Sequence, residues 1–186
     1  MEVQEPYGDA VDQRGRGADR RRRVPVGRPL GVPVALSPGL VAVVVAGVVT
    51  AALAGGPIGT LVLVLAVVGG SLLAHELAHA VVARLSGYRV DGVTLSLLGG
   101  LTAWSGPVPE PHVAVRIAAA GPATSAVLAC AFVGLGTLAG GLTGVLWVGA
   151  AVNLFDALVN LLPVPTSDGR AIARALRRPG RVTTSG

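Results

Sequence analysis

The stretch LLAHELAHAVVARL, residues 72–85, places two histidines and a glutamate inside a run that is otherwise almost entirely apolar. The chain of 186 residues has only three histidines, and two of them, His75 and His79, flank Glu76 here. In an α-helix, residues four apart share a face, so both imidazoles can bind one metal ion with Glu76 beside them. Random placement would produce this five-residue pattern on the order of once in a thousand sequences of this composition. The stretch therefore predicts a metal site on an apolar helix.

Composition places this helix in a membrane. Hydrophobic residues make up 52% of the chain and charged residues only 13%, which is too apolar for an ordinary soluble domain. A membrane-spanning helix needs about 17 to 25 residues, and four apolar segments reach that length: 38–54, 57–84, 112–139 and 142–162. We therefore expect an all-α polytopic membrane protein with about four transmembrane helices in the lipid bilayer.

The loop between the second and third segments has a strand-like pattern. Apolar and polar residues alternate from Val93 to Leu97 and again from Leu101 to Trp104, with the turn-forming pair Gly99-Gly100 between them. This pattern predicts a short β-hairpin at the membrane interface. An ordinary interfacial loop is the alternative.

Three regions are expected along the chain. Residues 1–35 are polar and rich in Arg, Gly and Pro, which predicts a disordered cytoplasmic tail. Residues 36–172 form the membrane-embedded core, and residues 173–186 form a basic cytoplasmic tail. An alternative treats residues 14–54 as a cleaved secretory signal that ends in Ala52-Leu53-Ala54.

The distribution of arginine predicts the orientation in the membrane. Every basic residue apart from histidine is arginine, and the arginines flank the first span at 20–23, the second at 84 and 89, and the fourth at 170–181. Because cytoplasmic loops carry excess positive charge, both termini and the hairpin are expected in the cytoplasm of a multi-pass cell-membrane protein. Arginine without lysine, together with abundant Ala, Gly and Val, favours a bacterial source. The basic tails serve this orientation, and no nucleic-acid partner is expected.

A third metal ligand is expected near the cytoplasmic end of the fourth segment, in NLLPVPTSDGR, residues 160–170. Zinc needs three protein ligands and an open position for water when it acts in catalysis. Pro163 and Pro165 lack amide protons and should end the helix at the interface. That break would let Asp168 turn back towards His75 and His79. The alternative role of Asp168 is to cap the following helix.

Two other polar residues of the fourth segment have alternative roles. Asn160 could donate to the oxyanion of a reaction intermediate or to carbonyls freed by Pro163. Asp156 is expected to pair with Arg116, because an isolated charge inside a membrane is costly. A substitute metal-ligand role for Asp156 is the alternative.

The ordered set His75-Glu76-Leu77-Ala78-His79, then Ala120-Gly121-Pro122, then residues 160–165 leading to Asp168-Gly169, resembles the site-2 protease family of intramembrane zinc metalloproteases. The resemblance implies one Zn²⁺ per chain, held by His75, His79 and Asp168, with Glu76 as the general base. It implies that the Gly99-Gly100 hairpin holds the substrate extended. It also implies substrates that are transmembrane or membrane-adjacent segments, such as those of membrane-bound anti-sigma factors or regulators, cleaved in regulated intramembrane proteolysis.

The chain departs from the family pattern at two places. Ser125 stands where the family usually has Asn, and Ser167-Asp168-Gly169-Arg170 stands where it usually has LDGG. Neither change touches the metal set. With no room for an inserted PDZ or trailing CBS domain, we expect a minimal catalytic core.

Three functions remain open from the residues. An intramembrane zinc endopeptidase is favoured. A non-proteolytic metal-binding or metal-transporting membrane protein is the alternative, and a structural subunit with incidental histidines is the third.

Overall fold

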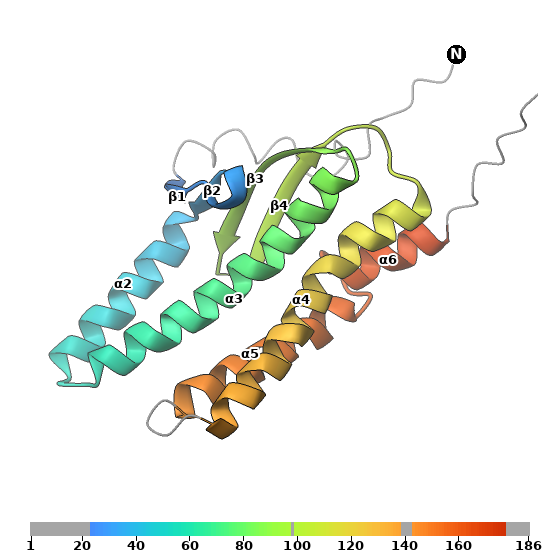
Figure 1. Cartoon of the computed structure of the whole chain (residues 1–186). Coiled ribbons are helices and arrows are strands. Elements are labelled where there is room, and N and C mark those ends of the chain that lie inside the picture. The colour runs from blue at the N-terminus through green and yellow to red at the C-terminus, as the bar shows by residue number, and fades with distance from the viewer. Residues whose placement is uncertain (1–22, 98, 139–142, 178–186) are drawn as a thin grey trace, which may run out of the picture.

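The computed structural model describes residues 23–97, 99–138 and 143–177. Helices dominate, and a small sheet lies at one end of them (Figure 1). In chain order the elements are β1 (Val24–Gly27), the 3-10 helix η2 (Pro29–Gly31), β2 (Val34–Leu36), α2 (Pro38–Leu53), α3 (Ile58–Leu85), β3 (Arg89–Ser96), β4 (Gly99–Ser105), α4 (Pro111–Leu138), α5 (Thr143–Leu161) and α6 (Asp168–Leu176).

Helices α2 to α5 correspond to the four expected apolar segments. Helices α3 and α4 have 28 residues each and α5 has 19, and all three are long and apolar enough to cross a membrane. At 1.5 Å per residue, α3 and α4 reach about 42 Å, against about 30 Å for the hydrocarbon core of a bilayer. Helix α2 has 16 residues, or about 24 Å. The mainly helical membrane fold is confirmed, with three helices of spanning length in the described part of the chain.

The hairpin predicted from the alternating pattern is present, but it belongs to a larger sheet. Strands β3 and β4 pair antiparallel, with Val93 opposite Thr102 and Leu95 opposite Gly100. The strand order is β1-β2-β3-β4; β2 runs parallel to β3, and β1 runs antiparallel to β2. Within the part of the chain that the structure describes, β4 is therefore an edge strand.

Residues 24–36 correct the expectation of a disordered leader through residue 35. They form β1, η2 and β2, and Val32 and Val34 are 0% and 3% exposed. Both valines pack in one cluster with Val93 and with Ala80 of α3. Its prolines and glycines leave no regular alternation of apolar and polar residues in the sequence. The segment is ordered instead by the pairing of β2 with β3. Residues 1–22 lie outside the described residues.

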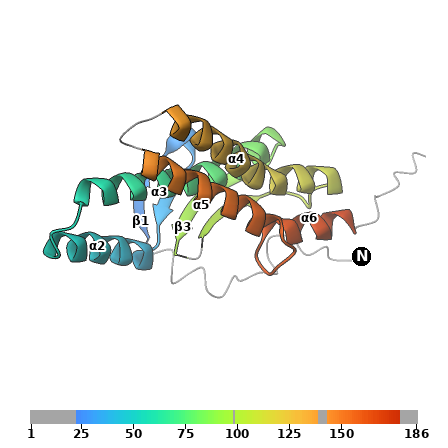
Figure 2. The same ribbon diagram turned by 90° about the horizontal axis from the view of Figure 1, so that it is seen from below.

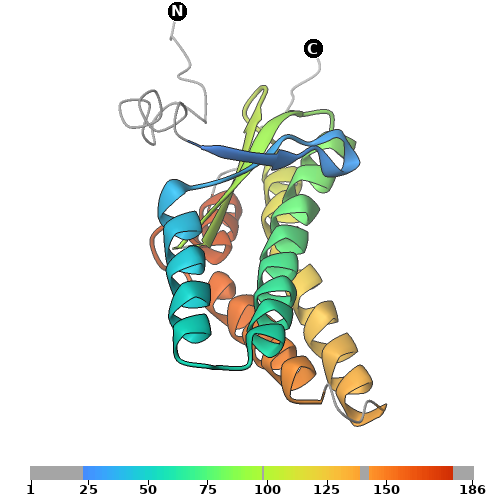
Figure 3. The same ribbon diagram turned by 90° about the vertical axis from the view of Figure 1, so that its left-hand side faces the viewer.

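Helix α3 contacts each of the other long helices, α2, α4 and α5. Helix α4 packs against both α3 and α5, while α2 contacts α3 (Figure 2). The sheet covers the C-terminal half of α3, and the α2–α3 turn lies at the opposite end (Figure 3). The metal-site motif thus lies in the part of α3 that the sheet covers.

Helix α5 ends just before Pro163, as the two prolines predicted. The helix stops at Leu161, the chain is non-helical through Ser167, and α6 begins at Asp168. Ser167 is the N-cap of α6, because its hydroxyl accepts from the amide of Arg170 at 3.2 Å. The capping role considered for Asp168 therefore belongs to Ser167. Helix α6 continues to Leu176, four residues into the expected tail, and residues 178–186 lie outside the described residues.

Candidate metal centre

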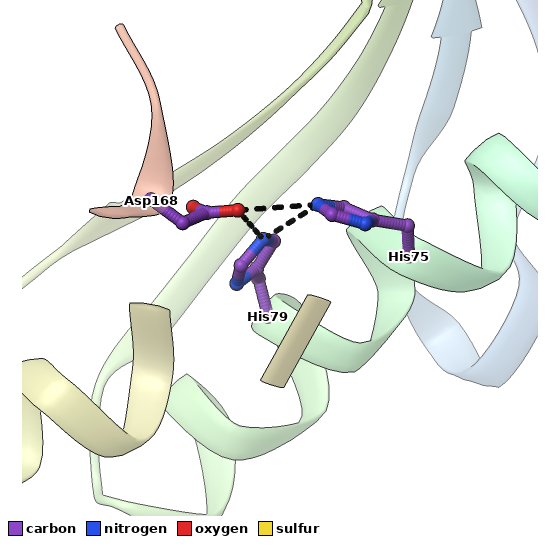
Figure 4. A group of neighbouring side chains, drawn as sticks. All are labelled: His75, His79 and Asp168. Atoms are coloured by element: carbon purple, nitrogen blue, oxygen red, sulfur yellow. Dashed lines mark hydrogen bonds and ion pairs between the residues drawn. The ribbon is translucent and has the colours of Figure 1, made fainter. Parts of the chain in front are cut away.

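Three side chains from two distant segments meet at the C-terminal half of α3. His75 and His79 are 3% and 7% exposed, and their Nε2 atoms lie 3.2 Å apart. Asp168 reaches back from the start of α6, and its Oδ2 lies 3.3 Å from each Nε2 (Figure 4). The turn after α5 therefore delivers the carboxylate to the histidine pair, as the proline-containing sequence suggested.

The spacing of these three atoms fits a four-coordinate metal ion. Zinc binds histidine nitrogen and carboxylate oxygen at about 2.0 to 2.2 Å, which puts tetrahedral ligand atoms about 3.3 to 3.6 Å apart. The observed separations of 3.2 and 3.3 Å are close to that range. Two imidazoles and one carboxylate are also a donor set that zinc accepts with a fourth position open. The cluster can hold zinc without rearrangement of its side chains.

The other ring nitrogen of each histidine is anchored by an acceptor. Nδ1 of His79 lies 2.7 Å from the carbonyl oxygen of Ile117, and Nδ1 of His75 lies 2.8 Å from Oδ2 of Asp156. A carbonyl or carboxylate oxygen only accepts, so both Nδ1 atoms carry the proton and donate. Each Nε2, which faces Asp168, is then the nitrogen left to bind a metal ion, once it has given up any proton that it shares with the carboxylate.

Gly121 explains the Ala-Gly-Pro motif of α4. A Cβ atom at this position would collide with Nε2 of both His75 and His79. The backbone of α4 therefore closes one side of the cluster, and only glycine leaves room for the two rings.

Glu76 lies beside the cluster and is held by β4. The residue is 6% exposed, and its Oε2 lies 2.6 Å from the hydroxyl of Thr102. The same hydroxyl lies 2.9 Å from the backbone oxygen of Glu76. A Cβ atom at Gly100, two residues earlier on the same strand, would collide with the Glu76 carboxylate. Strand β4 thus both makes room for this carboxylate and fixes one of its oxygens.

The electrostatics of Asp168 suit a metal ligand. Burial by itself raises the pKa of the Asp168 carboxyl, but hydrogen bonds and charge interactions with His75 and His79 outweigh it and hold the pKa below its ordinary value. Asp168 is therefore ionised at neutral pH, the form in which a carboxylate binds metal.

A cavity of about 660 Å³ opens onto these groups. Its wall combines the metal cluster and Glu76 with residues of β4, of α5 and of the turn before α6, including Gly99, Gly100, Thr102, Asn160 and Pro165. A volume of this size is typical of a ligand-binding cleft. The residues singled out from the sequence thus border one space.

Asp156 and Asn160 have partners other than those expected. In the described part of the chain, the ion pair of Asp156 is with His75, whereas Arg116 is exposed. Asp156 faces Nδ1 of His75, whereas Asp168 faces Nε2. Asp156 therefore lies on the side of the His75 ring away from the ligand cluster. Asn160 donates from Nδ2 to Oδ1 of Asp156 at 2.9 Å.

Sequence reasoning missed Thr102 and the position of Ser125. Ser125 is 0% exposed and lies between His75 and Asp156, with its Oγ 2.9 Å from Nδ1 and 2.7 Å from Oδ2. The sequence marked Ser125 only as a departure from the family pattern and did not predict its contacts with His75 and Asp156. Thr102 carries no comparable signal, because an alternating strand places threonine on many solvent faces.

Fold and site together define a class: a helical membrane protein in which two buried histidines and a half-buried aspartate could hold a metal ion beside a glutamate. Residues 62–142 match the model of peptidase family M50. The chain is 51% identical over 124 residues to the zinc metalloprotease named Rip3 of Mycobacterium tuberculosis, covering 62% of this chain and 32% of Rip3. It is 37% identical over 113 residues to the zinc metalloprotease named sll0528 of Synechocystis sp., covering 57% and 29%.

A solved structure shares the fold. The site-2 protease from Methanocaldococcus jannaschii superposes with a TM-score of 0.70 at 21% identity, over 83% of this chain and 71% of that one. The chain spans about a third of the length of the curated relatives it matches. Over residues 62–142 the chain is therefore similar to peptidase family M50, its curated relatives are named as zinc metalloproteases, and it shares its fold with a site-2 protease.

Proposed function

We propose that this chain is an intramembrane zinc endopeptidase in which His75, His79 and Asp168 hold the metal and Glu76 is the general base. The observation that carries the proposal is the convergence of three ligand atoms and one buried carboxylate on a single cavity. A metal store or transporter has no need of a carboxylate held beside the ligands by a separate strand. A protease does, because hydrolysis requires a base next to the attacking water.

Each of these residues has its own proposed role in peptide hydrolysis. Bound zinc would polarise the substrate carbonyl and lower the pKa of a water molecule. Glu76 takes the proton from the attacking water and later gives it to the leaving amine. Thr102 keeps the Glu76 carboxylate in one orientation through the 2.6 Å hydrogen bond. Asn160 has a second amide hydrogen beyond the one given to Asp156, and it borders the cavity, so it is placed to donate to substrate oxygen.

The edge strand β4 is the proposed substrate-binding element. Its outer side has no partner strand in the described sheet, and Gly99 and Gly100 border the cavity without side chains. An extended peptide that pairs with this edge would offer its backbone to Glu76 and the metal ligands. A helical peptide bond is shielded by its own hydrogen bonds, so pairing with β4 would unwind a transmembrane substrate before cleavage. Membrane-bound anti-sigma factors and other single-pass regulators, cleaved in regulated intramembrane proteolysis, are the proposed substrates.

The proposed topology has four spans with both termini and the sheet in the cytoplasm. Helix α2 starts beside the sheet and ends next to the start of α3, so it runs antiparallel to α3 although it is shorter (Figure 3). Local thinning of the bilayer can accommodate its 16 residues. The packing of Val32 and Val34 against α3 favours retention of the segment before α2 over its removal as a signal.

The test is co-expression of the chain with a tagged single-pass regulator encoded by a neighbouring gene. Glu76→Gln should lower cleavage by about 10²- to 10⁴-fold, the usual contribution of a general base, while the purified variant keeps its zinc. His75→Ala should lose both. Full cleavage by the Glu76→Gln variant would reject the mechanism. Zinc binding without cleavage of any membrane protein, in wild type, would favour a metal-binding or transport function.

A further inference from the structure

Asp156 is a carboxylate inside a membrane-spanning helix, and it does not belong to the ligand cluster. Its Oδ2 lies 2.8 Å from Nδ1 of His75 and 2.7 Å from Oγ of Ser125, and its Oδ1 lies 2.9 Å from Nδ2 of Asn160. Ionisable residues at such positions are costly and are retained where they have partners or a function. Here the hydrogen-bond donors of three different side chains converge on one carboxylate.

We propose that Asp156 is a positioning residue that sets the tautomer and orientation of His75 for zinc binding. The inference rests on the proposed function, in which His75 is a zinc ligand. Histidine ligands commonly donate their outer N–H to a carboxylate, which fixes the ring and makes the inner nitrogen a better ligand. Asp156 is the acceptor that does this for His75.

The two histidines differ in how they are held. His79 donates to the carbonyl oxygen of Ile117 at 2.7 Å, so its orientation depends on the backbone of α4. Among the described residues, Nδ1 of His75 instead faces two side chains, Asp156 and Ser125. Side-chain substitution can therefore loosen His75 alone, while His79 stays in place.

Ser125 is a support for the same contact. Its hydroxyl donates to Asp156 Oδ2 and lies 2.9 Å from Nδ1 of His75. A serine oxygen is a weaker acceptor than a carboxylate, so the His75 proton is held mainly by Asp156. Loss of the Ser125 hydroxyl leaves that stronger contact in place.

Asp156 also sets the orientation of Asn160. A carboxylate accepts only, so it selects the amide end of Asn160 and turns the side-chain oxygen away. One carboxylate therefore links the ring of a metal ligand to an amide at the cavity wall.

The test measures zinc affinity by chelator competition on the purified full chain in nanodiscs, with no substrate present. Asp156→Ala should weaken zinc binding by about 10- to 100-fold, the usual effect of removing such a partner. Ser125→Ala should weaken it less. Asp156→Asn keeps the size of the side chain and should fold where alanine does not; it should weaken zinc by roughly 3-fold or more, because an amide oxygen is a poorer acceptor.

Asn153→Ala is the matched control. Asn153 lies one turn earlier on α5, is 1% exposed, and donates to Oγ of Ser71 in α3 at 2.7 Å. Its loss breaks a buried α5–α3 contact without touching His75, so zinc affinity should stay close to that of the wild type.

Two results would overturn the inference: Asp156→Ala and Asp156→Asn both binding zinc as tightly as wild type, or Asn153→Ala weakening zinc as much as Asp156→Ala. In either case His75→Ala separates this failure from failure of the proposed function. If His75→Ala loses zinc, only the role of Asp156 is wrong. If His75→Ala keeps zinc, the ligand assignment and the role of Asp156 fall together.

Discussion

At the scale of single residues, two glycines shape the site as much as the charged groups do. Gly121 lets the backbone of α4 reach the imidazoles of His75 and His79, and Gly100 lets β4 reach the carboxylate of Glu76. Neither has a positive φ that calls for glycine within its helix or strand. The missing Cβ is required by the space that the two imidazoles and the Glu76 carboxylate occupy.

Gly121→Ala tests this requirement. The added methyl must displace both imidazoles or the helix, and overpacking of this kind costs about 1 to 3 kcal/mol. We expect zinc affinity to fall by about 10- to 100-fold, measured by chelator competition, since each 1.4 kcal/mol is tenfold. Gly134→Ala is the control, because a Cβ there on the same helix meets nothing within 4 Å. Equal zinc affinity in the two variants would contradict the packing argument.

At the scale of elements, the register of β3 and β4 connects the sheet to the chemistry. Val93 opposite Thr102 and Leu95 opposite Gly100 set which residues of β4 face α3. A slip of one residue would turn Leu101 towards Glu76 and take the Thr102 hydroxyl away, because side chains alternate along a strand. A substrate that pairs with β4 would thus bind to the same strand that orients the general base.

Thr102→Val removes the hydroxyl and keeps the shape of the side chain. A hydrogen bond to a charged group contributes about 1.5 to 3 kcal/mol, so we expect cleavage to slow by roughly 10- to 100-fold. Zinc content should not change, because Thr102 does not contact the ligand cluster. The Thr102→Ser variant keeps the hydroxyl and should retain most of the activity. If valine and serine variants cleave equally well, Thr102 has no part in orienting Glu76.

At the scale of the whole molecule, arginines gather at the sheet end of the helices, which is the end proposed to be cytoplasmic. Arg84, Arg89 and Arg116 lie at or near the end where the sheet sits, and Arg170 and Arg174 lie on α6. The α2–α3 turn at the other end, residues 54–57, has no charged residue. His79 lies six residues before the end of α3, about 9 Å along its axis. The cavity is therefore proposed to take its water from the cytoplasmic side.

Cysteine labelling tests this orientation. Cys130 is exposed and is first replaced by serine, after which Ala54→Cys and Ser105→Cys place single thiols at opposite ends of α3. A membrane-impermeant maleimide should label position 54 in intact cells and position 105 only after permeabilisation. The reverse pattern would place the site at the outer face and contradict the positive-inside argument.

The sequence by itself determined the features that depend on neighbouring residues. The lengths of the apolar segments, the shared face of His75 and His79, and the helix break at Pro163 are local properties, and all were predictable. The hairpin was also predictable from strand alternation, but Gly99 and Gly100 were wrongly expected to form its turn, because both lie in β4 and pair with β3. Segment 24–36 was not, since its strands depend on a partner far along the chain.

Only the tertiary structure decided how the site is supported. Thr102 meets Glu76 across 26 residues of chain, and Ser125 meets His75 across 50. Asp156 could be recognised as a costly charge, but its neighbour could not be named, and Arg116 was the wrong choice. Such contacts depend on how helices and strands pack, so no periodic pattern in the local sequence predicts them. Sequence therefore determined which residues are proposed to carry the chemistry, and packing decided which residues hold them in place.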